Sequence, residues 1–117
     1  MKLLIGVFAG LLAADMTGNW TLRHDPDFSG HPAVHECKIQ QQGEKLTFAC
    51  DPGGAKFTGE IKNNRVTFEH TTGKDKEIVV RYTGAINHER SFMKGAWQYT
   101  DPGDKKEKTG RFSLEKH

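Results

Sequence analysis

The sequence lacks a dominant charge, because its 17 lysines and arginines are nearly balanced by 15 aspartates and glutamates, for a formal net charge of +2. Proteins that bind nucleic acids or anionic membranes usually carry a basic stripe. The most basic run here, 105–108, lies beside acidic residues and indicates a solvated loop. We therefore expect no nucleic-acid partner.

Long apolar runs are also scarce. The run 3–14, LLIGVFAGLLAA, follows Lys2 and ends before Asp15. It is too short to span a bilayer, which takes about 20 residues, but it resembles the apolar region of a secretion signal. We expect 1–14 to be a signal peptide or a short N-terminal hydrophobic segment, with a packed helix or anchor as the alternative, and 15–117 to form one domain. No membrane span is expected.

Cysteine is limited to Cys37 and Cys50. Two cysteines at this spacing do not supply the four ligands of a structural zinc site. Together with an export signal they favour an oxidising compartment and one disulfide. The expected location is therefore secreted or periplasmic.

Helical periodicity is missing from Thr17 onward, where short alternating runs are separated by turn signals every eight to twelve residues. Eight consecutive strands with mostly short connections predict an all-β fold, an eight-stranded antiparallel up-and-down (meander) β-barrel. The expected strands are 18–24, 33–42, 45–51, 55–62, 65–71, 76–86, 92–100 and 108–115.

Two short turns fix the register of two hairpins. Asn63-Asn64 and Gly43-Glu44 each suit a two-residue hairpin turn. Counting outward from the second turn places Cys37 opposite Cys50 at a non-hydrogen-bonded position, where Cα atoms approach to about 4.5 Å. This distance suits a disulfide, so a cross-strand bridge is predicted.

The alternation also predicts which side chains face inward, and most of them should simply form the core of a small barrel. A glycine recurs two residues before a large apolar residue, where it would let the strand coil and make room for a neighbouring ring; the instances are Gly18, Gly59, Gly84, Gly95 and Gly110. The expected inward residues are Trp20, Leu22, Ile39, Leu46, Phe48, Phe57, Ile61, Val66, Phe68, Ile78, Val80, Tyr82, Ile86, Met93, Trp97, Phe112 and Leu114.

Polar residues in phase with this lining mark a candidate site. In a meander, the ends of odd strands and the starts of even strands meet at one mouth, which here also receives the longer connections and the disulfide. A loop-rich barrel mouth is a usual ligand site. The residues expected to contact a ligand there are His24, His35, His70, Trp97 and Tyr99, and His31 could join them.

The histidines leave alternatives open. They could bind a metal, serve as acid–base groups near neutral pH, or simply form a polar rim. No phosphate-binding glycine loop, nucleophile elbow or metalloprotease helix signature is present. No cofactor is expected, and an enzyme is the weaker interpretation.

The segment G-N-W-T-L (18–22) resembles the first strand of calycin-like barrels such as lipocalins and avidins. The later pattern F-T-G-E-I, V-T-F-E, Y-T-G-A-I, M-K-G-A-W and T-G-R-F is similar to small bacterial secreted lipocalin-like or streptavidin-like domains, over nearly all of 17–115. The polar biotin contacts of streptavidin find no counterpart here. Some secreted proteinase inhibitors share such a disulfide-bearing barrel and act through an N-terminal segment.

The leading functional hypothesis is an exported binding protein that holds a small, partly apolar ligand at the mouth. The first alternative is a protein-binding or inhibitory module that uses its loops or N-terminal arm. The second is an enzyme or metal site built on the histidines. Val79 and Phe92, on the outward phase, could mark a homodimer face.

Overall fold

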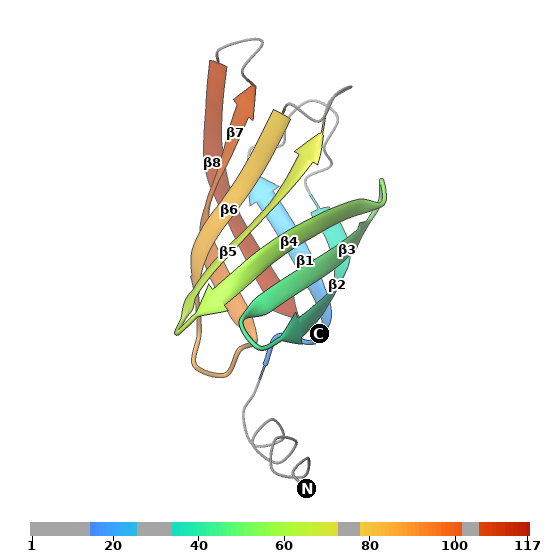
Figure 1. Cartoon of the computed structure of the whole chain (residues 1–117), viewed down its shortest axis with the longest axis vertical. Helices are drawn as coiled ribbons and strands as arrows, with labels where there is room; N and C mark the ends of the chain where they lie inside the picture. The colour runs from blue at the N-terminus through green and yellow to red at the C-terminus, as the bar shows by residue number, and fades with distance from the viewer. Residues whose placement is uncertain (1–14, 26–33, 73–77, 102–105) are drawn as a thin grey trace, which may run out of the picture.

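The computed structural model describes residues 15–25, 34–72, 78–101 and 106–117. These residues form one closed barrel in which each strand pairs antiparallel with its sequence neighbour and the last pairs with the first (Figure 1). The predicted meander is therefore confirmed. The strands are β1 (Gly18–Asp25), β2 (Val34–Gln42), β3 (Lys45–Asp51), β4 (Ala55–Lys62), β5 (Arg65–Thr72), β6 (Ile78–Ile86), β7 (Phe92–Asp101) and β8 (Lys106–Lys116).

Some expectations lie outside the described residues. These are the N-terminal segment 1–14, His31, the first residues of two expected strands (33 and 76–77), and most of the longer connections at the mouth.

Both predicted hairpin registers are present. Gln42 pairs with Lys45 across the Gly43-Glu44 turn, and Lys62 pairs with Arg65 across the Asn63-Asn64 turn. Gly43 and Asn63 adopt φ values of 64° and 59°, the left-handed conformation that such two-residue turns require and that glycine and asparagine tolerate.

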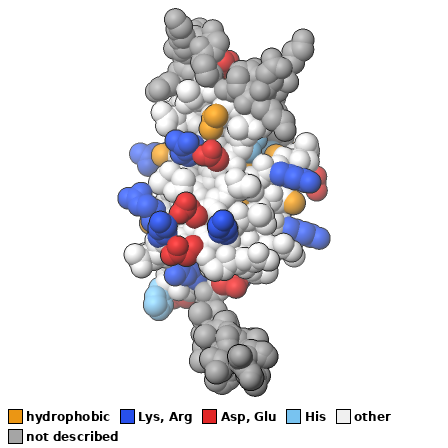
Figure 2. Space-filling model, viewed as in Figure 1, with side chains coloured by type: hydrophobic (Ala, Val, Ile, Leu, Met, Phe, Trp, Pro, Cys, Tyr) orange, Lys and Arg blue, Asp and Glu red, His pale blue; other side chains and the backbone are white. Residues whose placement is uncertain are grey.

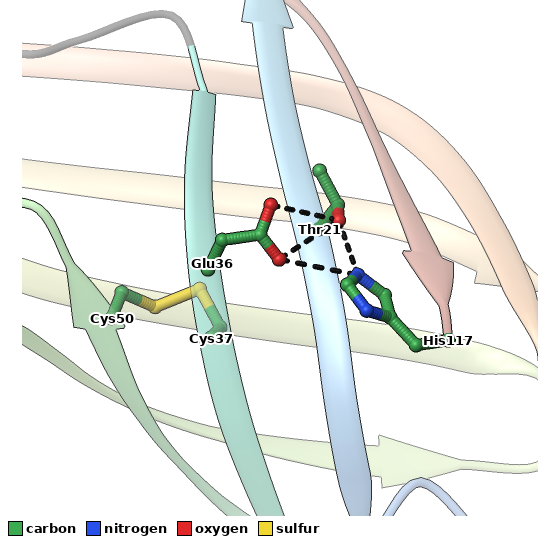
Figure 3. Close-up of a disulfide and its surroundings, with 5 residues drawn as sticks. All are labelled: Thr21, Glu36, Cys37, Cys50 and His117. Carbon is green, nitrogen blue, oxygen red and sulfur yellow. Dashed lines mark hydrogen bonds and ion pairs between the residues drawn. A yellow bond between two sulfur atoms is a disulfide. The ribbon is translucent and has the colours of Figure 1, made fainter.

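Cys37 and Cys50 are direct partners in the β2–β3 ladder and are joined by a disulfide, with their Cα atoms 4.0 Å apart (Figure 3). This short separation belongs to the closer, non-hydrogen-bonded class of antiparallel pairs. The bridge favours an oxidising compartment, since disulfides are rare where thiols are kept reduced.

Removing the bridge by a Cys37→Ala/Cys50→Ala double substitution is expected to lower the free energy of unfolding by about 3 kcal/mol, because the unfolded chain regains the entropy that the closed loop removes. Urea unfolding of the oxidised protein against this variant measures the difference. A reductant should weaken the parent to the same extent and leave the variant unchanged. Mass spectrometry that finds two free thiols in protein from its native compartment would contradict both the bridge and export.

The predicted core is confirmed with one correction. Every expected inward residue is buried except Ile78, which is half-buried because it begins β6 at the loop-rich end. The sequence reasoning missed Met16, which is fully buried just before β1.

Aromatic rings fill the middle of the barrel. The Phe68 ring stacks between those of Phe48 and Tyr82, with centroids 4.4 and 4.6 Å away. Phe57 and Phe112 meet it edge-on, both at 5.5 Å. Such contacts stabilise beyond area burial alone, and they occupy the space that a deep ligand would need.

Four of the five inward glycines lie where a neighbouring strand or side chain approaches closely, whereas Gly18 meets only the flexible side chain of Lys116. A Cβ atom on Gly110 would lie 2.5 Å from Nε1 of Trp97, and one on Gly95 would lie 2.0 Å from the backbone oxygen of Thr83. These positions therefore admit a neighbouring ring or strand only because they carry no side chain.

Candidate functional site

Two histidines face inward near the mouth. His24 is the last residue but one of β1, and His35 is the second residue of β2. Strand alternation points both side chains into the barrel, where each is 4% exposed. Their ring centroids lie 5.8 Å apart, so the structure brings these two predicted site residues together.

Trp97 and Tyr82 complete this group. The His24 ring meets that of Trp97 at 6.2 Å, edge to face, and that of Tyr82 at 6.3 Å. Burial raises the pKa of the Tyr82 hydroxyl, and a neutral tyrosine hydroxyl can donate or accept a hydrogen bond. We call His24, His35, Tyr82 and Trp97 the polar-ring layer. The sequence predicts Tyr82 only as a core residue.

His70 and Tyr99 lie on another part of the wall. Both pair with Val80, one from β5 and the other from β7, so the three form a row across β5, β6 and β7. The half-buried His70 packs on Phe57, with centroids 4.4 Å apart. Lys108 places its Nζ 5.7 Å from the ring of the partly buried Tyr99. These are the other two predicted site residues.

The opposite end of the barrel is closed by Trp20. Its indole nitrogen donates a hydrogen bond of 2.8 Å to the backbone oxygen of Met16, and both residues are fully buried. The Lys116 ammonium lies 6.0 Å from the same ring, within reach of a cation–π interaction. A ligand of the polar-ring layer would therefore enter from the mouth.

A polar cluster on the outer wall was not predicted. Thr21 faces outward from β1, yet it is only 7% exposed because Glu36 and His117 lie beside it (Figure 3). Its hydroxyl is 3.1 Å from each carboxylate oxygen of Glu36 and also contacts Nε2 of His117. That same nitrogen is 3.1 Å from the Glu36 carboxylate. In a catalytic triad the carboxylate binds the other imidazole nitrogen, so this triangle is not a nucleophile-activating relay. Only the cross-strand pairing of Thr21 with Glu36 could have signalled it.

Neither a metal-binding cluster nor a membrane-spanning helix is found among the described residues. They contain no group of three histidine, cysteine, aspartate or glutamate side chains placed to hold a metal ion. They also contain no helix of sufficient length and apolarity to span a membrane.

Comparisons with protein-family models, with curated proteins and with solved structures found no match. The closed eight-stranded meander is consistent with a calycin-like fold, and a fold by itself does not assign a function.

Proposed function

We propose that this chain is an exported binding protein that holds a small, partly apolar ligand at the loop-rich mouth of its barrel. The observation that carries the proposal is the polar-ring layer, in which two imidazoles and an indole gather at the mouth end of an otherwise apolar interior.

The chemistry of these rings defines the ligand class. Imidazole and indole groups present flat apolar faces together with hydrogen-bonding nitrogens. Burying polar groups without partners costs free energy. Ligand sites commonly contain a few such groups within apolar surroundings, where they orient the ligand and provide specificity. The aromatic rings around Phe68 occupy the barrel below. The ligand is therefore shallow-bound, with an apolar body and at least one hydrogen-bonding group.

The cellular location of the protein and its structural family form part of the same proposal. The disulfide and the apolar run 3–14 support export to an oxidising compartment. The G-N-W-T-L start of β1 and the meander order support a place among lipocalin-like or streptavidin-like barrels.

Fragment binding followed by NMR tests the site. Uncharged fragments that combine an aromatic ring with one hydrogen-bonding group are titrated into ¹⁵N-labelled protein. We expect the Trp97 indole signal and the His24 and His35 ring signals to shift. The Trp20 indole signal should stay in place, because this ring lies at the closed end.

Matched variants make the test specific. His24→Gln and His35→Gln keep a polar side chain and should weaken fragment binding roughly tenfold, the effect of losing one good hydrogen bond. His88→Gln alters an exposed histidine outside the polar-ring layer and should leave the affinity unchanged. A site at the mouth is refuted if no fragment binds, or if bound fragments shift Trp20 in place of Trp97.

The filled interior also favours a second candidate, a protein-binding or inhibitory module. Such a barrel serves as a rigid support for its loops or N-terminal arm, and its middle needs no cavity. Phe92 and Val34, each 39% exposed, are the large apolar side chains exposed in the described surface. A concentration-dependent mass in sedimentation, abolished by Phe92→Ser, would place a homodimer contact at this residue.

A further inference from the structure

Three exposed cations lie close together on the outer wall, and one of them, Arg111, has Asp25 as its ladder partner. Arg23 of β1, Lys94 of β7 and Arg111 of β8 are exposed, and within the described ranges none of them makes an ion pair or a side-chain hydrogen bond. Elsewhere on the wall Arg81 binds Glu69 at 3.0 Å.

On the face seen in Figure 2, basic and acidic side chains are interleaved. On β4, the Lys62 ammonium and the Glu60 carboxylate lie 3.6 Å apart and form an ion pair. Other wall cations, such as Lys38 and Arg65, also make no ion pair with a described residue, so the three cations are distinguished by lying close together.

Strand register gathers the three cations around Ser113. Lys94 and Arg23 are its direct partners on either side, while Arg111 precedes it by two residues on β8. Adjacent strands are about 4.8 Å apart, and two residues span about 6.8 Å along a strand. The three Cα atoms therefore fall within an area of roughly 10 by 7 Å.

A groove follows this area. It is lined by the three cations with Asp25, by the small residues Gly95, Ala96, Gly110 and Ser113, and by the inward-facing His24 and Phe112. Three cations against one carboxylate leave a local charge of +2. A second groove, across β3, β4 and β5, has the opposite balance, with three glutamates against two lysines.

We propose that this cationic groove binds a small molecule through a phosphate or sulfate ester group seated at Ser113. A tetrahedral oxyanion accepts several charge-assisted hydrogen bonds at once, and arginine and lysine are its usual partners. The compact spacing of the three cations suits one multiply charged group better than an extended polyanion. The groove volume, about 800 Å³, leaves room for the rest of the molecule. The three cations project from the outer face, which distinguishes this site from the mouth, although His24 of the polar-ring layer also lines the groove.

Titration with phenyl phosphate, phenyl sulfate and benzoate at constant ionic strength tests the groove, with amide NMR shifts as the readout. Phenyl phosphate or phenyl sulfate should shift the amides of Arg23, Lys94 and Ser113, and the tighter of the two identifies the ester class. Arg23→Gln/Arg111→Gln should weaken this binding at least tenfold.

Lys38→Gln/Lys56→Gln is the control, because it removes two exposed cations from β2 and β4. It should change the affinity by less than about twofold, the size of a general charge effect at moderate salt. The proposal is overturned if both double variants weaken binding equally, if benzoate binds as tightly as the two esters, or if neither ester binds.

Discussion

Replacing Phe68 by alanine is expected to lower the free energy of unfolding by about 3–5 kcal/mol, the usual cost of deleting a fully buried aromatic ring. Phe68 is completely buried and contacts the rings of Phe48, Tyr82, Phe57 and Phe112. A closed barrel cannot collapse easily around the void, because every strand is hydrogen-bonded on both sides. The cost should therefore lie near the upper end of this range.

Urea unfolding of Phe68→Ala beside Phe92→Ala measures this effect. Phe92 is the same residue type on the outer wall, 39% exposed, and its loss should cost no more than about 1 kcal/mol. Equal costs for the two variants would show that the middle of the barrel is not tightly packed.

The result bears on the depth of the ligand site. If Phe68 carries the expected share of stability, the aromatic rings are structural and a ligand must stay at the level of His24, His35 and Trp97. A small cost would mean that the rings can be displaced, so a ligand could reach further down. Stability measurements thereby constrain a binding hypothesis before any ligand is known.

Most of the fold could be predicted because it follows from local signals. Side-chain alternation with a period of two defines each strand and its inward face, and the turns at Gly43 and Asn63 fix two registers within hairpins. The Cys37–Cys50 bridge depends only on one of those hairpins. For the same reason, the strand ends shift by no more than two residues from their expected positions.

The arrangement of the site depended on contacts that no hairpin fixes. Sequence order places His24, His35 and His70 at one mouth, but strand tilt and stagger decide which rings meet across the interior. The structure pairs the first two and adds Tyr82, while His70 packs on Phe57. Alternation reports the face of a residue and not its height in the barrel.

The cationic groove was missed for a related reason. Arg23 becomes a neighbour of Ser113 only when β1 pairs with β8, the closure of the barrel between residues some 90 positions apart. Composition could not reveal it either, because the balanced total charge conceals a local excess.

The second large effect is expected for Gly95→Ala. This substitution should lower the free energy of unfolding by about 3 kcal/mol or more, at or above the usual upper end for overpacking a core. The added Cβ would lie 2.0 Å from the backbone oxygen of Thr83 and 2.6 Å from Cα of Gly84. Both atoms belong to the backbone of β6, so no side chain can rotate to relieve the clash. The β6–β7 ladder would have to separate locally, and this ladder carries Trp97 opposite Tyr82.

Gly43→Ala is the comparison that separates this clash from ordinary backbone strain. Gly43 has open space around its Cβ position but a φ of 64°, so alanine there should cost only about 1 kcal/mol. In thermal unfolding, the midpoint temperature of Gly95→Ala should be well below that of Gly43→Ala. The NMR signal of the Trp97 indole should move only in Gly95→Ala. If the two variants unfold at the same temperature, the barrel can bend at Gly95 and accommodate the added Cβ without opening. The inward glycines would then be needed for strand flexibility and not for close packing.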